Sequence, residues 1–210
     1  INFSLSAGQS IGITGDDNIE NSFFLDFLWR LRQPKSGFIK LSGVDTQDLA
    51  LDSLRSEIAI VSTIEIINGS ISENISLHRT NVQYEDIQKA INFVGLTAVI
   101  DRLPQRQNTV LHPLSCILSD DELKRLMLAR AIVGSPSVLA VDALFDHSSP
   151  EVRNIIFKNL LKEENPWSLI LVSDLPEVLQ LCSNVLQLKR STDSQAIQKN
   201  TSEYNITKEL

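Results

Sequence analysis

The stretch LSDDELKRLMLARAI at residues 118–132, followed by VLAVD at residues 138–142, decides how this chain folds. Ser119 and Glu122 have the spacing of a capping box and acidic residues fill the first turn, so the first stretch predicts a helix. The second stretch is apolar up to Asp142, which predicts a buried strand that ends in a carboxylate. Together they predict a capped helix closely followed by a strand inside the core.

Length and composition predict a globular protein with a substantial core. The chain has 210 residues, of which 42% are hydrophobic, enough for one large domain. Lys and Arg number 19 against 26 Asp and Glu, and the net charge of −7 argues against a nucleic-acid partner, which would require a basic surface. No apolar run approaches the roughly 18 residues of a membrane span. The start without Met suggests a domain from a longer protein, and we expect residues 191–210 to form a polar tail.

A strand, a loop and a helix are predicted near the beginning of the chain. Residues 10–14 are an apolar run that ends at Gly15, and residues 22–31 have the composition of a mostly buried helix. This is the frame of a phosphate-binding loop, whose pattern is Gly-x-x-x-x-Gly-Lys-Ser/Thr. Laid on the chain, the pattern predicts these nucleotide-binding positions: Gly15, Asp16, Asp17, Asn18, Ile19, Glu20, Asn21, Ser22 and Phe23.

Two of these positions carry chemistry that is unfavourable for a phosphate. Glu20 stands where the pattern has its second Gly, and Asn21 stands where it has the Lys that contacts the phosphates. A carboxylate about 4 Å from a phosphate charge costs roughly 4 kcal/mol at an effective dielectric constant of 20. Such a cost lowers the affinity by about three orders of magnitude. We therefore expect a nucleotide to bind here weakly or not at all.

Further motifs follow in a fixed order at fitting distances. They read SGFI at residues 36–39, GVD at 43–45, NGSISENI at 68–75, IDRLP at 100–104 and LSDDE at 118–122. Over residues 1–190 the chain resembles the nucleotide-binding domain of an exporter-type ABC transporter. The resemblance implies an α/β fold: a P-loop NTPase core with a parallel sheet, an N-terminal antiparallel β portion and an inserted helical subdomain.

The resemblance also implies a domain organisation. Residues 1–190 are expected to form a single domain, with residues 1–66 and 136–190 as its core and residues 67–135 as the helical subdomain. Residues 191–210 follow as the tail. In the family this domain hydrolyses ATP in a head-to-tail dimer and drives the export of a substrate.

The family's nucleotide-contacting and catalytic positions are altered in this chain. After Ser119, the signature residues Gly-Gly-Gln are replaced by Asp120, Asp121 and Glu122. The Glu that polarises the attacking water is replaced by Ala143, and the switch His by Asp174. Loss of a general base typically costs 10²–10⁴ in rate. The resemblance therefore implies a fold whose catalytic groups are missing.

The resemblance places the magnesium positions at Ser22, Thr63 and Asp142. Thr63 stands where the family has a Gln, and Thr has a shorter reach. Ser22 either ligates the metal or begins a helix, and Asp142 either binds the metal or hydrogen-bonds the backbone at the end of its strand.

Carboxylates are predicted to fill both anion sites of the family. In relatives, the start of the signature helix closes over the γ-phosphate of an ATP held by the partner subunit. Here Ser119 and Glu122 cap that helix themselves, and Asp17 with Glu20 has the same spacing at the phosphate-binding loop. Two other expectations concern helix surfaces: Lys124 and Arg125 should be solvated or face a partner, and Ile155 should face the core.

Three hypotheses about function follow. The first is a degenerate domain with ATP and Mg²⁺ bound weakly or not at all, acting as a structural or regulatory dimerisation partner in transport. Its partners would be the transmembrane domain of the same transporter and a second nucleotide-binding domain, in a homodimer or a heterodimer at the cytoplasmic face of the membrane. The alternative is an active but slow ATPase that drives export in the full-length transporter. The third is an interaction module that uses no nucleotide.

Overall fold

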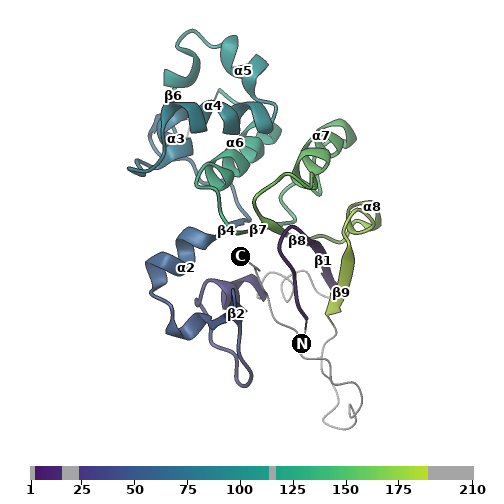
Figure 1. Cartoon of the computed structure of the whole chain (residues 1–210). Coiled ribbons are helices and arrows are strands. Elements are labelled where there is room, and N and C mark those ends of the chain that lie inside the picture. The colour runs from purple at the N-terminus through teal and green to yellow at the C-terminus, as the bar shows by residue number, and fades with distance from the viewer. Residues whose placement is uncertain (1–2, 16–23, 114–116, 189–210) are drawn as a thin grey trace.

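The computed structural model of the protein describes residues 3–15, 24–113 and 117–188. At its centre lies a five-stranded sheet with the order β4-β7-β8-β1-β9, whose neighbouring strands all pair in parallel (Figure 1). The strands are β1 (Ser10–Gly15), β4 (Ile58–Val61), β7 (Val138–Asp142), β8 (Ser168–Val172) and β9 (Asn184–Leu188). The predicted α/β fold with a parallel sheet is confirmed.

Antiparallel strands accompany the parallel sheet. In the N-terminal part of the chain, β2 (Lys40–Leu41) pairs with β3 (Val44–Asp45) in an antiparallel ladder. A second antiparallel pair joins β5 (Gly69–Ser70) to β6 (Val110–Leu111). The antiparallel β portion expected from the resemblance is therefore present, as a short hairpin beside the main sheet.

The helices divide into groups around the sheet (Figure 1). One group gathers on one side of it: α3 (Ile71–Ser76), α4 (Tyr84–Phe93), α5 (Thr97–Asp101) and α6 (Asp120–Ile132). The 3-10 helix η2 (Arg106–Asn108) lies with α3 and α5 in this group. The others are α2 (Leu51–Glu57), α7 (Pro150–Leu160), α8 (Pro176–Leu179) and the 3-10 helix η1 (Thr46–Asp48). The first group comes between β4 and β7 in the chain, within residues 67–135. The division into a core and a helical subdomain stays a prediction.

Both faces of the sheet are covered, which explains why β7 and β8 are apolar apart from the terminal residues Asp142 and Ser168. Successive side chains of a strand point to opposite faces. One face packs against residues 24–28 and α2 through Val138, Ala140, Ile170 and Val172. The other packs against α6 and α7 through Leu139, Val141, Leu169 and Leu171. The core thus sits on both sides of the strands whose ends carry the candidate site.

The expectation for Ile155 is wrong. On α7 the buried residues are Ile156, Phe157 and Leu160, whereas the side chain of Ile155 is 53% exposed. The buried stripe has the spacing i, i+1 and i+4, so Ile155 falls at the margin of the helix face that meets the core.

Arg106 provides a test of backbone strain. It is exposed and begins η2 with a φ of 48°, a left-handed conformation that costs a residue with a side chain about 1–2 kcal/mol. We predict that Arg106→Gly stabilises the protein by about 0.5–1 kcal/mol, because part of this gain is offset by the greater freedom of Gly in the unfolded chain. Urea denaturation measures the difference. The matched control is Gln105→Gly, since Gln105 has a φ of −106° and should lose stability on the same change. Equal effects of the two substitutions would contradict the interpretation.

Candidate functional site

The carboxyl ends of parallel strands form the edge at which open α/β sheets bind their ligands. Here the register pairs Val61 with Val141, and Asp142 with Val172, so β4, β7 and β8 end at a similar level. Beyond these strand ends lie three of the predicted site residues: Thr63, Ala143 and Asp174. The structure thus brings the described metal and catalytic positions to one edge of the sheet, while the predicted metal position Ser22 lies outside the described residues.

The phosphate-binding loop is described only at its first residue. Gly15 is the last residue of β1 and pairs with Leu188 of β9. The other predicted positions lie outside the described residues: Asp16, Asp17, Asn18, Ile19, Glu20, Asn21, Ser22 and Phe23. Their roles stay predictions.

Ala143 occupies the position directly after Asp142. Its amide donates a hydrogen bond of 2.8 Å to the carbonyl of Val172, which continues the β7–β8 ladder by one bond. Its φ is 49° and its methyl group is exposed. A methyl group accepts no proton, so this position offers no general base beside the half-buried Asp142.

The fit of this edge to magnesium and ATP depends on the oxygen donors and charges that its described residues supply. Asp142 and Thr63 carry oxygen atoms of the kind that magnesium prefers. Magnesium at a phosphate site is bound by one or two protein carboxylates together with phosphates and water, and Asp142 is a carboxylate of this kind. Asp174, exposed, places a negative charge where the family has an imidazole. The described part of this edge thus offers oxygen donors for magnesium, but neither a general base at position 143 nor an imidazole at position 174.

The second predicted group lies on a different element, at the start of α6. Ser119 is the N-cap: its hydroxyl accepts from the amide of Glu122 at 3.4 Å, and the Glu122 carboxylate accepts from the amide of Ser119 at 2.8 Å. The predicted capping box is therefore formed. It satisfies backbone donors that would otherwise be available to a bound anion.

The expectation that Lys124 is solvated is wrong, whereas its contact with a partner stays a prediction. Its side chain is only 13% exposed, and its Nζ lies 2.6 Å from Asp120 and 3.9 Å from Asp121. Arg125 also makes internal contacts, because its guanidinium donates to the carbonyls of Gly95 at 2.9 Å and of Asp121 at 3.3 Å. A Lys four residues after Asp120 is the sequence signal for this pairing. The two aspartates at the start of α6 are thus partly neutralised within the helix.

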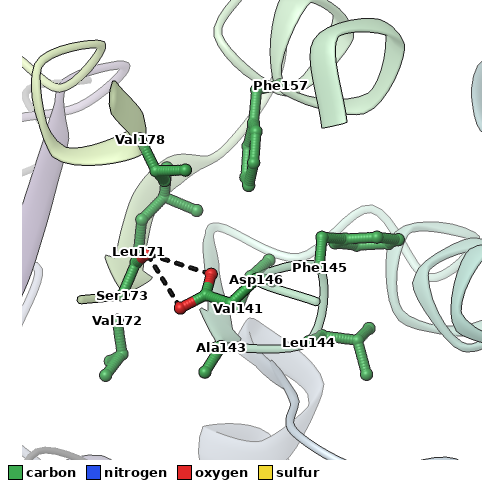
Figure 2. A pocket seen from close by; sticks show the side chains of 10 residues that line it. All are labelled: Val141, Ala143, Leu144, Phe145, Asp146, Phe157, Leu171, Val172, Ser173 and Val178. Carbon is green, nitrogen blue, oxygen red and sulfur yellow. Dashed lines mark hydrogen bonds between the residues drawn. The ribbon is translucent and has the colours of Figure 1, made fainter. Parts of the chain in front are cut away.

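An interaction that the sequence did not predict joins the loops after β7 and β8. Figure 2 shows the carboxylate of Asp146 turned toward Ser173, whose Oγ lies 2.9 and 3.0 Å from the two carboxylate oxygens. The amide of Asp174 donates to the same carboxylate at 3.4 Å. Burial raises the pKa of Asp146, while the hydrogen bond from Ser173 acts in the opposite direction. The two residues are 27 positions apart, so local patterns carry no signal for the contact.

Arg153 and Glu177 reinforce this loop. Arg153, on α7, donates to the carbonyl of Asp146 at 3.2 Å and to the carbonyl of Ser148 at 2.7 Å. Its Nη2 lies 3.3 Å from the carboxylate of Glu177 on α8. The loop after β7 is therefore held by contacts from two helices and a strand end.

Cys182 lies beside this region and has no free thiolate at neutral pH. It is half-buried, and burial raises the pKa of its thiol to about 11. Nucleophilic chemistry by this residue is therefore disfavoured.

Comparison with known proteins gives consistent matches. The model of the family described as "ABC transporter" matches residues 1–145. A probable ABC transporter ATP-binding/permease protein of Haemophilus influenzae is 30% identical over 190 residues, covering 90% of this chain and 34% of that protein. ABC transporter B family member 24 of Arabidopsis thaliana, a mitochondrial protein, is 25% identical over 209 residues, covering 99% of this chain and 30% of that protein.

A solved structure shares the fold. A bacterial Atm1-family ABC exporter with ATP bound superposes with a TM-score of 0.77 at 23% identity, covering 86% of this chain and 32% of that chain. The present chain thus spans about a third of the length of these relatives. The ordered motifs, the parallel sheet and the family match over residues 1–145 lead to one conclusion: this chain belongs to the ABC transporter family, as a nucleotide-binding domain of the exporter type.

Proposed function

We propose that this chain is a degenerate nucleotide-binding domain, which binds ATP weakly or not at all and does not hydrolyse it. The observation that carries the proposal is Ala143, an exposed methyl group directly after Asp142 at the carboxyl edge of the sheet. Activation of a water molecule requires a base within hydrogen-bond reach. Neither the backbone amide nor the methyl group of Ala143 is one.

The charge distribution supports weak binding of a polyphosphate. The loops after β7 and β8 carry the carboxylates of Asp146 and Asp174. In the phosphate-binding pattern, Glu20 and Asn21 replace a Gly and the Lys. A carboxylate about 4 Å from a phosphate charge costs roughly 4 kcal/mol at an effective dielectric constant of 20.

The start of α6 supports the same proposal for the partner's nucleotide. Its capping box satisfies the helix terminus, and its first turn carries Asp120 and Asp121. Two carboxylates at a helix start stabilise the helix through its dipole but repel an incoming phosphate. We infer that this helix has exchanged a ligand contact for internal hydrogen bonds.

The proposed role is that of a structural or regulatory partner in a transporter. The names of the relatives include an ATP-binding/permease protein and an exporter, each about three times as long as this chain. Of the described helices, the longest has 13 residues, and none is both long and apolar enough to cross a membrane. We propose that the domain acts beside the transmembrane domain of the same transporter, at the cytoplasmic face of the membrane, and pairs with a second nucleotide-binding domain in a homodimer or a heterodimer.

A slow ATPase is the second candidate function. The observation that favours it is Asp142, which lies at the carboxyl end of β7 as the family's magnesium position requires. In this alternative, Ser22, Asp142 and backbone amides would hold magnesium and ATP in the full-length transporter.

The first prediction of this proposal concerns binding. Calorimetric titration of the protein with ATP and magnesium at low salt should show no heat at millimolar ATP. Glu20→Gly with Asn21→Lys should raise the affinity by up to about three orders of magnitude, because it removes a repulsion of roughly 4 kcal/mol and adds a cation.

The matched control is Glu163→Gly with Asn154→Lys. This double variant makes the same change of charge at two exposed positions: Glu163 lies in a turn and Asn154 on α7. Micromolar binding of ATP by the unaltered protein would overturn the proposal, as would an equal gain in the control.

The second prediction separates the two functions. We expect the intact transporter that carries this domain to show the same background ATP turnover with Asp142 as with Asp142→Asn, because this site contributes none. Phosphate release measured under saturating ATP provides the comparison. If the substitution abolishes turnover, the domain is an ATPase and the alternative replaces the proposal.

A further inference from the structure

The loop of residues 143–149 is tied to its surroundings at several points. On its inner side, Leu144 is 6% exposed and Phe145 is fully buried. The space beneath them, lined also by Val141, Leu171 and Val178, has no room for a water molecule (Figure 2). The inner side of the loop is therefore packed against the core, and Asp146 and Ser173 line the same space from the ends of β7 and β8.

Ser173 is buried at the end of β8 and is held in place by its own hydrogen bonds. It is 2% exposed, and its amide donates to the carbonyl of Ile13 on β1 at 3.1 Å. Its hydroxyl accepts from the amide of Leu175 at 3.1 Å and donates to the carboxylate of Asp146. A hydroxyl with one proton and an acceptor role already filled is held in one orientation. The hydroxyl that donates to Asp146 therefore has a fixed orientation.

The hydrogen bond between Ser173 and Asp146 is charge-assisted when the carboxylate is ionised, and such bonds are stronger than neutral ones. The charged groups around Asp146 come from the loops after β7 and β8 and from the helices α7 and α8. Asp174 lies beside it after β8, His147 is its neighbour in the loop, Arg153 contacts its carbonyl from α7, and Glu177 pairs with Arg153 from α8. The contact therefore links the loop after β7 to the loop after β8 through groups of this chain alone.

We propose that Asp146 and Ser173 form a latch that holds residues 143–149 against the end of β8 in one conformation, whether or not a nucleotide is present. The latch rests on the proposed function in one respect: a domain without bound ATP needs another way to keep this loop ordered. It explains why a carboxylate lies half-buried here beside a second carboxylate, an arrangement that is otherwise unfavourable.

Hydrogen exchange of the full-length protein tests the latch. The amides of Ala143, Asp146 and Ser148 donate hydrogen bonds within the loop region and report on its opening. Ser173→Ala should speed their exchange by roughly tenfold, because it removes one charge-assisted hydrogen bond. The matched control is Ser168→Ala at the other end of β8, where the hydroxyl donates to the carbonyl of Ser6. It should leave exchange in residues 143–149 unchanged.

Asp146→Ala removes the same bond from the loop side and keeps the test decisive if Ser173→Ala fails to fold. The double variant should exchange no faster than the faster single variant. Equal exchange in the Ser173→Ala and Ser168→Ala proteins would overturn the latch. Addition of ATP and magnesium should change nothing in the unaltered protein. If ATP slows exchange of the loop in the unaltered protein, the proposed function is wrong. The comparison of Ser173→Ala with Ser168→Ala still tests the latch in that case.

The dependence of stability on pH gives a separate prediction for Asp146. Burial raises its pKa in the folded protein, so the folded state binds the proton more tightly than the unfolded chain. The Asp146 carboxyl contributes its full stabilisation when it is protonated, below the pKa of about 3.9 that an Asp has in the unfolded chain. This contribution to the free energy of unfolding is lost as the pH rises through the pKa of Asp146 in the folded protein. Asp146→Asn removes this loss, and the difference in unfolding free energy should therefore shift in favour of the variant between about pH 4 and pH 7. Chemical denaturation at the two pH values measures it, and parallel behaviour of the two proteins would contradict the assignment.

Discussion

The parallel register of β1, β7 and β8 is the constraint on which the rest of the structure depends. Ile13 and Asp142 both pair with Val172, so three strands end at one edge of the sheet. The sheet is buried on both faces, and a shift by one residue would turn each apolar side chain to the opposite face. The strand ends therefore stay together even though the residues beyond them have changed their chemistry.

Fold and activity draw on different residues in this chain. The packing involves buried side chains such as Leu139, Ile170 and Phe145, together with the capping boxes at Ser70 and Ser119. Neither the exposed Ala143 nor the exposed Asp174 contributes to that core. Substitution at the edge can thus remove a function at little cost to stability, and the fold by itself does not decide what the domain does.

Local patterns predicted most of the fold, because strands buried on both faces and capped helices leave clear signals in the sequence. The predicted helix at residues 118–132 forms, beginning at Asp120 after its Ser119 cap. Predictions failed where the outcome depended on the angle at which a helix meets the core, as for Ile155, or on a pairing along the helix, as for Lys124. The contact between Asp146 and Ser173 was beyond prediction, since it depends on how two loops meet across the sheet edge.

Carboxylates in this domain find their donors within the chain. Glu122 accepts from the amide of Ser119, Asp120 pairs with Lys124, and Asp146 accepts from Ser173. At the start of α6, Glu122 thus occupies a backbone donor, and Asp120 a cation, for which an external phosphate would otherwise compete. Internal acceptors cost no association entropy, whereas a bound nucleotide must overcome several kcal/mol of it. A helix start that is capped in this way forms without a bound ligand, which supports the proposed role in assembly.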